Sequence, residues 1–194
     1  MTGTPTPPYR PTGWPLAAAL LAAAASMAVG AQLDVPMRPV PMSLQSLAVL
    51  GAGALLGPVR GLGAVALYLA AGALGLPVFA GGEAGLDRFA GPTAGYLYAF
   101  PLGAVAVGFA AQRGWMRRFF PALMAGLAGH AILLTGGALR LAHSIGAEAA
   151  VDGGLAPFVI GAVVKSAVLA LGFVAVSRGF RPDERSDGGR TPGR

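Results

Sequence analysis

The chain has 194 residues, of which only 11% are charged and 55% are hydrophobic, and its mean hydropathy is +0.65. An average soluble domain carries roughly 25% charged residues, and a disordered chain combines low hydrophobicity with high charge, so this composition argues against both. The sequence contains no cysteine, which excludes a disulfide scaffold and a thiol nucleophile. The composition is that of a membrane protein.

Charge-free runs divide the sequence into helix-sized pieces. Five runs each exceed 20 residues, and a sixth contains a single charge; about 20 apolar residues suffice for a helix to cross a bilayer. Barrel strands would be about 10 residues long and would alternate. We therefore predict an all-α membrane protein with six transmembrane helices, at about 14–33, 43–58, 61–78, 92–112, 119–141 and 157–177. The predicted membrane domain is 14–178, between disordered tails at 1–13 and 179–194.

The positions of the arginines predict the orientation. The net charge of +6 comes from 13 arginines and one lysine. With a cytoplasmic N-terminus, ten basic residues lie inside, whereas only Arg38, Arg88 and Arg140 lie outside, as the positive-inside rule requires. We expect both termini in the cytoplasm and the chain in the cell (inner) membrane. The positive charge then reflects the orientation in the lipid bilayer, so we predict no nucleic-acid partner. A cleaved signal peptide is the alternative interpretation of residues 1–33, but its apolar run is longer than usual.

Signatures of catalysis are missing from the sequence. It has no P-loop, no HExxH motif and no Gly-x-Ser-x-Gly elbow, so we predict neither an enzyme nor a bound cofactor or metal. One of the two histidines, His130, lies within the fifth predicted span. We interpret it as bonding to a neighbouring helix.

A charge and an unusual loop point to a ligand site. Lys165 lies near the middle of the sixth predicted span, at a cost of about 2.5–3.5 kcal/mol, with no carboxylate one turn away in the same helix. It either snorkels to the interface or faces a cavity that holds an anionic group, and we favour the cavity. The apolar, Gly-rich outer segment 76–96 ends at a predicted helix start. We expect it to form a lid or a wall of that cavity.

Several motifs then follow one another along the chain. They are Pro-Val-Pro-Met-Ser-Leu-Gln-Ser-Leu at 39–47, Leu-Gly-Pro at 56–58, Gly-Leu-Pro-Val-Phe at 75–79, Gly-Pro-Thr-Ala-Gly-Tyr at 91–96, and Pro-Phe at 157–158 before Lys165. In this order they resemble the BioY family, the biotin-specific S components of energy-coupling-factor (ECF) transporters, over about 17–173. The resemblance implies a six-helix S-component bundle that binds biotin near the outer face. It also implies two partners: a transmembrane coupling protein and a pair of ATPases.

The resemblance carries over to individual residues unevenly. It implies biotin contacts from Lys165, Tyr96, Thr93 and Gln45. We add Arg88, from its charge and position, as a clamp for the biotin carboxylate. The family's late motif has an aspartate three residues before the lysine, where this chain has Ala162.

Small residues on the first helix dock the coupling protein in this family, according to the same resemblance. Three pairs have the required spacing, namely Ala18 with Ala22, Ala19 with Ala23, and Ala24 with Ala28. The alanine-rich sequence does not choose between them, and we take the first two as candidates. Two other functions stay open at this point: an S component for a different small vitamin, and a structural membrane protein in which Lys165 pairs with another helix.

Overall fold

The computed structural model describes residues 13–35, 40 and 42–179. The predicted tails therefore lie outside the described residues, except for Gly13 and Gly179. The α-helices are α1 (Trp14–Gln32), α2 (Gln45–Leu56), α3 (Pro58–Ala73), α4 (Ala94–Gln112), α5 (Phe119–Ile145), α6 (Ala147–Gly154) and α7 (Ala156–Gly179). Short elements connect them: β1 (Asp34–Val35), β2 (Met42–Ser43) and the 3-10 turns η1 (Ala80–Gly82), η2 (Leu86–Phe89) and η3 (Trp115–Arg117).

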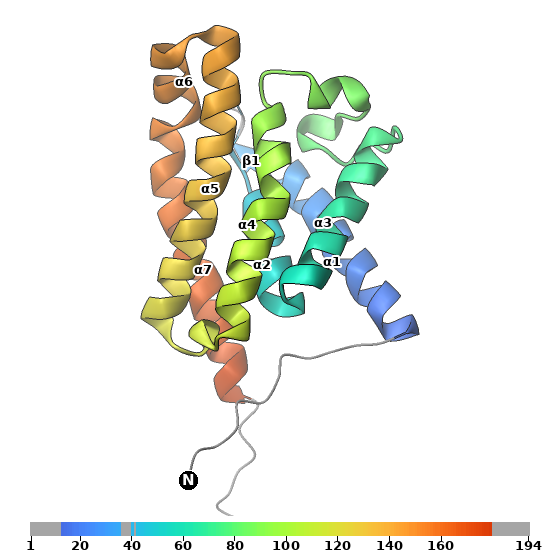
Figure 1. The fold of residues 1–194 in the computed structure, drawn as a ribbon, viewed down its shortest axis with the longest axis vertical. Coiled ribbons are helices and arrows are strands. Elements are labelled where there is room, and N and C mark those ends of the chain that lie inside the picture. The colour runs from blue at the N-terminus through green and yellow to red at the C-terminus, as the bar shows by residue number, and fades with distance from the viewer. Residues whose placement is uncertain (1–12, 36–39, 41, 180–194) are drawn as a thin grey trace, which may run out of the picture.

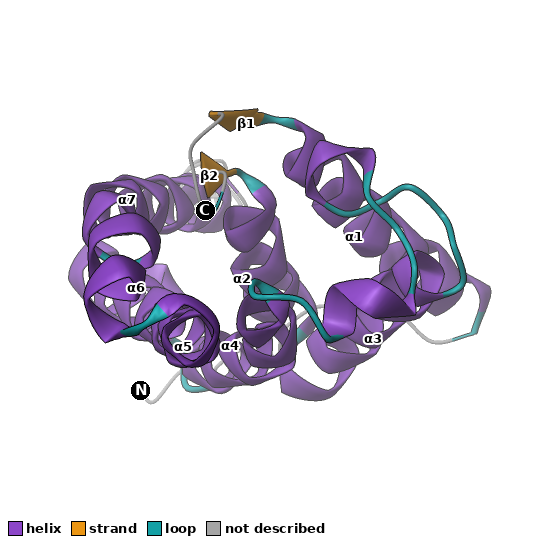
Figure 2. Ribbon diagram, turned by 90° about the horizontal axis from the view of Figure 1, so that it is seen from above, coloured by secondary structure: helices purple, strands orange, loops and turns teal. Residues whose placement is uncertain are grey.

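Helices α2 and α4 form the middle of the bundle. They lie between α5 and α7 on one side and α1 and α3 on the other (Figure 2). The start of α1 and the end of α7 lie at the lower end of the molecule in Figure 1, whereas η1, η2 and α6 lie at the upper end. The chain therefore runs between the two ends of the bundle an even number of times.

Four helical stretches are long and apolar enough to cross a membrane: α1, α4, α5 and the α6–α7 pair. The predicted second and third spans are shorter than expected, because α2 has 12 residues and α3 has 16. Only Gly57 separates them, with a φ of +81° that suits glycine, and Pro58 then starts α3 with a preset φ. The third helix therefore begins before the predicted Gly61 and ends before the predicted Val78.

Glycines bring α2, α3 and α4 into backbone contact. A Cβ added to Gly53 would lie 2.0 Å from the Ala104 carbonyl oxygen of α4, and one added to Gly61 would lie 2.7 Å from Gly53. At Gly108, an added Cβ would meet the backbone of Pro58 at 2.5 Å. Such close approach is typical of helix packing in membranes.

The upper half of α5 differs from the prediction. The helix continues beyond the predicted Leu141 to Ile145, so Arg140, which the sequence placed at the outer end of this span, lies more than one turn before the end of α5. Gly146, with a φ of +91°, then turns the chain into the unpredicted helix α6. At α4 the opposite occurs, since the helix begins at Ala94 and Pro92 precedes it.

Apolar side chains fill the bundle and also cover its outside. The main core cluster includes Leu50 of α2, Val65 and Tyr68 of α3, Val107 of α4 and Leu133 of α5. Large apolar side chains elsewhere are exposed, as a lipid-facing surface requires; they include Val59, Leu102, Phe120, Leu139 and Ile160. The predicted all-α architecture is confirmed.

Candidate functional site

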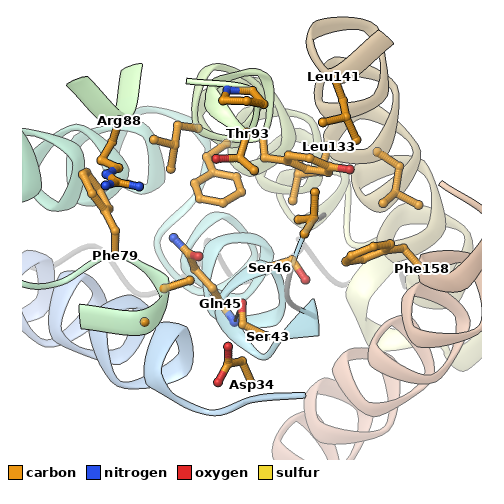
Figure 3. A pocket seen from close by; sticks show the side chains of 18 of the residues that line it. Asp34, Ser43, Gln45, Ser46, Phe79, Arg88, Thr93, Leu133, Leu141 and Phe158 are labelled. Atoms are coloured by element: carbon orange, nitrogen blue, oxygen red, sulfur yellow. Dashed lines mark hydrogen bonds between the residues drawn. The ribbon is translucent and has the colours of Figure 1, made fainter. Parts of the chain in front are cut away.

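A cavity of about 470 Å³ opens between the middle helices and the upper connections. Its walls come from β1, β2, α2, α4, α5, α7 and residues 79–93 of the outer segment. All five residues predicted to contact the ligand line it, namely Gln45, Arg88, Thr93, Tyr96 and Lys165. Figure 3 shows Phe79 and Arg88 on one side of the cavity, Phe158 on the other, and Gln45 and Ser43 between them.

Lys165 projects from α7 towards the start of α2. Its Nζ donates to the Ser46 hydroxyl at 2.7 Å and to the Ser43 carbonyl at 3.1 Å. Both acceptors are neutral, and an ammonium group has three donors. One N–H of Lys165, which lines the cavity, is therefore left for a ligand. Among the described residues, no carboxylate is hydrogen-bonded to this ammonium group.

Gln45 is buried in the first turn of α2. Its Nε2 donates to the Tyr68 hydroxyl at 2.6 Å, and that hydroxyl donates to the Val78 carbonyl at 3.0 Å. This chain of bonds holds the amide group in place and connects α2 to α3 and the outer segment. The antiparallel pairing of Asp34 with Ser43 brings both residues to the same wall.

Tyr96 contributes its ring to the cavity. Its hydroxyl donates to the Gly154 carbonyl of α6 at 2.6 Å, so the oxygen is already engaged. The ring centroid lies 6.3 Å from that of Phe158 on α7. A Cβ added to Gly137 would lie 2.1 Å from the Tyr96 ring, so this glycine makes room for the aromatic wall. Thr93, just before α4, lines the cavity without capping that helix.

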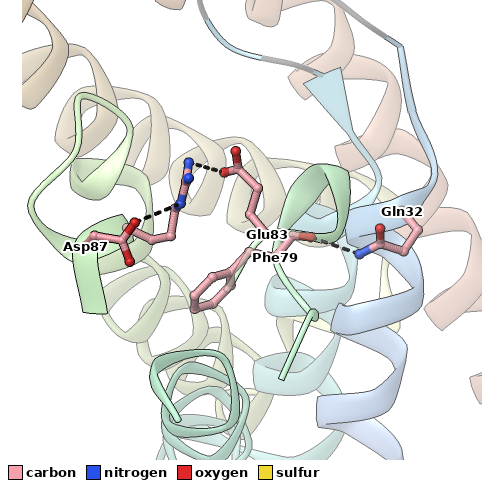
Figure 4. Close-up of polar contacts among 5 residues, drawn as sticks. Gln32, Phe79, Glu83 and Asp87 are labelled. Atoms are coloured by element: carbon pink, nitrogen blue, oxygen red, sulfur yellow. Dashed lines mark hydrogen bonds and ion pairs between the residues drawn. The ribbon is translucent and has the colours of Figure 1, made fainter. Parts of the chain in front are cut away.

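Arg88 is paired within the outer segment. Its Nη1 lies 2.5 Å from Glu83 Oε2, and its Nε lies 3.7 Å from Asp87 Oδ2 (Figure 4). The Arg88 side chain is 40% exposed and that of Glu83 is 45% exposed. A guanidinium group carries five N–H donors, so Arg88 can bind a second carboxylate or exchange Glu83 for one.

Contacts with four helices attach the outer segment to the bundle. Gln32 of α1 donates to the Phe79 carbonyl at 2.9 Å (Figure 4), and Gly85 donates to the Gly72 carbonyl of α3 at 2.8 Å. Tyr98 of α4 donates to the Phe89 carbonyl at 2.6 Å, and Arg140 of α5 donates to the Ala90 carbonyl. The segment is part of the cavity wall, as the sequence predicted.

Phe79 is the least exposed aromatic residue of this segment. Its side chain is 4% exposed and meets the Tyr68 and Phe89 rings edge to face, with centroids 5.6 and 5.9 Å apart. A Cβ added to Gly72 would lie 2.1 Å from the Phe79 ring. The glycine on α3 therefore sets the position of the aromatic wall.

His130 lines the cavity although the sequence gave no reason to place it there. Its Nδ1 lies 2.9 Å from the Ser166 hydroxyl of α7, which agrees with the predicted bond to a neighbouring helix. Its Nε2 is buried and has no hydrogen-bond partner among the described residues. A lone histidine in an apolar run carries no spacing signal, so only the fold could place it here. Ala162, also at the wall, is buried and offers a methyl group.

The four alanines predicted to dock the coupling protein divide into two pairs on α1. Ala18 and Ala22 are exposed, whereas Ala19 and Ala23 are partly buried. Ala19, Ala22 and Ala23 line an apolar groove between α1 and α2. The structure thus separates pairs that the sequence could not distinguish.

Comparisons with known proteins agree with this architecture. The BioY family profile matches residues 12–182. The probable biotin transporter BioY of Pyrococcus horikoshii is 37% identical over 143 residues, which cover 74% of this chain and 84% of the relative. The biotin transporter BioY of Thermotoga maritima is 39% identical over 150 residues, which cover 76% and 86%.

A solved structure gives the same result at the level of the fold. The S-component for biotin from an ECF-type ABC transporter aligns with a TM-score of 0.72 and 25% sequence identity, over 87% of this chain and 95% of that chain. Together with its long apolar helices, these relatives make the chain a multi-pass membrane protein. It is a member of the BioY family.

Proposed function

We propose that this protein binds biotin as the S component of an ECF transporter, and that it is a substrate-binding subunit and not an enzyme. The observation that carries the proposal is the cavity, where a partly buried ammonium group, aromatic rings and an outer guanidinium group line a single space. Its volume of about 470 Å³ lies within the roughly 300–1,000 Å³ range of small-molecule sites. Membership of the BioY family and the names of the relatives support the choice of ligand.

The chemistry of biotin matches the two ends of this cavity. The ureido ring carries one carbonyl and two N–H groups, and the tail ends in a carboxylate. The remaining N–H of Lys165 is suited to the ureido carbonyl, while the rings of Tyr96 and Phe158 offer an apolar surface to the fused rings. In this orientation the carboxylate reaches Arg88, with Thr93 and Gln45 contributing polar groups beside the ligand.

In the proposed topology, six helices cross the cell (inner) membrane and both termini are cytoplasmic. Two observations support it: the arginine distribution, and the position of the α1 start and the α7 end at the same end of the bundle (Figure 1). In this orientation the cavity opens towards the outside. A membrane-impermeant thiol reagent should fail to label, from outside, a cysteine introduced in the 181–194 tail.

The proposed partners are a transmembrane coupling protein and a pair of ATPases. The exposed pair Ala18 and Ala22 supplies the docking face on α1, with the partly buried Ala19 and Ala23 beside it. Small side chains allow another helix to approach closely in the membrane.

Direct ligand analysis tests the proposal. The full-length protein is purified in detergent, its bound small molecules are identified by mass spectrometry, and the ligand-free protein is titrated with biotin. We expect copurified biotin and saturable binding. A different copurified vitamin, with no biotin binding, would assign the cavity to another substrate, and no ligand of any kind would favour a structural role.

A further inference from the structure

The buried imidazole of His130 lies where α5 and α7 meet. The residue is 3% exposed. Its Nδ1 lies 3.0 Å from the Gly126 carbonyl of its own helix and 2.9 Å from the Ser166 hydroxyl of α7. A Cβ added to Gly126 would lie 3.0 Å from the Ser166 Cβ, so the two helices touch here. The ring is thus held from its Nδ1 side.

This hydrogen-bond pattern assigns the tautomer. Because a carbonyl oxygen can only accept, we assign the proton to Nδ1, which then donates to the Gly126 carbonyl. In the neutral ring, Nε2 then presents a lone pair. A doubly protonated ring would put a second positive charge beside Lys165, the chain neighbour of Ser166, with no carboxylate hydrogen-bonded to either group among the described residues.

The lone pair of Nε2 is unused. The atom is buried and has no partner in the part of the chain that the structure describes, yet His130 belongs to the cavity wall. Buried polar atoms are almost always hydrogen-bonded, and an exception at a cavity calls for an explanation. Nearby on α7, Lys165 supplies donors and Ala162 supplies only a methyl group. This wall therefore has a donor to offer a ligand and one unfilled acceptor.

We infer that His130 Nε2 accepts a hydrogen bond from a ureido N–H of biotin, and that His130 is a ligand-binding residue of this chain. The inference rests on the proposed biotin function. A ureido group pairs a carbonyl with adjacent N–H groups, so the same ring that receives an N–H from Lys165 presents a donor to the imidazole. In this chain α5, and not only α7, recognises the ureido ring. The family motif places an aspartate acceptor at position 162 of α7. In this chain position 162 is alanine, and His130 of α5 supplies the acceptor instead.

Two substitutions separate the nitrogens of the ring. In His130→Asn, the side-chain amide keeps an N–H near the Nδ1 position and removes the acceptor at Nε2. In His130→Gln, the longer side chain can place its amide oxygen near the Nε2 position. Biotin is titrated into both full-length variants in detergent. We expect His130→Asn to weaken binding about tenfold, the size of one buried hydrogen bond, and His130→Gln to stay within about threefold of the unmodified protein.

A second variant and a second ligand make the test specific. Adding Ala162→Asp to His130→Asn restores an acceptor from α7, and we expect it to recover most of the lost affinity. Biotin analogues methylated at one or the other ureido nitrogen complete the cycle. One of these analogues should bind the unmodified protein poorly. Its affinity should fall little further in His130→Asn, because the methyl group has already removed the ureido N–H bond to Nε2. Thermal unfolding of the ligand-free variants serves as the folding control.

A spectroscopic measurement tests the inference without changing His130, so it still applies if a His130 variant fails to fold. In a His143→Gln background His130 is the only histidine of the 194-residue sequence, so its ¹⁵N imidazole signals are assigned directly. Biotin should shift the unprotonated Nε2 resonance upfield, as accepting a hydrogen bond does. Unchanged affinity in His130→Asn, or an unmoved Nε2 signal in the biotin-saturated protein, would overturn the inference while leaving biotin binding intact. No biotin binding by the unmodified protein would instead refute the proposed function and the inference with it.

Discussion

The two ends of the cavity are built in different ways. At the deep end, where Lys165 and His130 lie, a bond between the buried His130 and Ser166 side chains joins α5 to α7, and the partly buried Lys165 bonds to Ser46 of α2. At the outer end, the Arg88–Glu83 pair is nearly half exposed, and surrounding water competes with it. Exposed ion pairs contribute about 0–1 kcal/mol, whereas an unmatched buried polar group costs about 1–3 kcal/mol. We therefore expect the deep end to select the ligand and the outer end to exchange partners as the ligand enters.

Removing the charge at the deep end should have the largest effect on binding. Lys165→Ala eliminates a charge-assisted bond worth about 1.5–3 kcal/mol, so we expect biotin affinity to fall tenfold or more, measured by titration in detergent. Ser46→Ala is the matched control, since it removes one neutral partner of Nζ and leaves the ammonium group. Equal affinity in Lys165→Ala and the unmodified protein would mean that Lys165 only snorkels.

Displacing the aromatic wall tests how far the outer end depends on packing. Gly72→Ala would put a methyl group 2.1 Å from the Phe79 ring, and overpacking of this kind costs about 1–3 kcal/mol. We expect a lower melting temperature and several-fold weaker biotin binding. Gly63→Ala, on the same helix but with its nearest neighbour 3.8 Å away, should change neither quantity. Similar melting curves for both variants would contradict this account of Phe79.

Changing the ion pair tests the exchange of partners directly. Arg88→Ala should weaken biotin binding moderately, by about threefold to tenfold for a half-exposed charged contact, without loss of thermal stability. Glu83→Gln frees the same guanidinium group and should tighten binding, with a stronger dependence on salt. If Arg88→Ala binds biotin normally, the ligand carboxylate lies elsewhere.

Restoring the aspartate at the deep end should give a smaller gain. Ala162→Asp adds an acceptor beside Lys165, but we infer that His130 already accepts one ureido N–H, so only the second is left. We expect biotin affinity to rise about threefold, a fraction of the roughly 1 kcal/mol of an ordinary hydrogen bond, in the same titration. A gain of the full tenfold or more in the presence of His130 would argue that the imidazole does not contact the ligand.

A change far from both ends should leave the cavity unaffected. Ala22→Leu enlarges the exposed face of α1, so we expect unchanged biotin titrations together with loss of copurification with the coupling protein and ATPases. Ala17→Leu, exposed on another face of the same helix, is the control. Copurification that survives Ala22→Leu would place the docking face elsewhere.

Much of the fold could be predicted because charge-free runs of membrane length leave few alternatives to helices. The boundaries could not, since they depend on local contacts. Pro58 starts α3 only because Gly57 can adopt a positive φ beneath Gly108. Helix α6 mixes Ala and Gly with two acids, a composition that predicts a loop as readily as a helix.

The site was predictable where a residue is costly or carries a motif. Lys165 is conspicuous in an apolar run, and Gln45, Thr93 and Tyr96 belong to motifs of the family. The Glu83 partner of Arg88 depends on the course of a Gly-rich loop, which sequence periodicity does not describe. His130 gave no signal, because its role depends on which of its two nitrogens α7 engages.

The shortness of α2 also has a consequence for the membrane. At a rise of about 1.5 Å per residue, its 12 residues span about 18 Å, against a hydrocarbon thickness of about 30 Å. The helix begins at the cavity with Gln45, so α2 alone falls about 12 Å short of crossing the hydrocarbon core. In the orientation that we propose, bilayer thickness sets how far the cavity lies below the outer headgroups. Lipids with shorter chains should bring the site closer to the water. The rate at which the vitamin enters and leaves should then depend on lipid chain length.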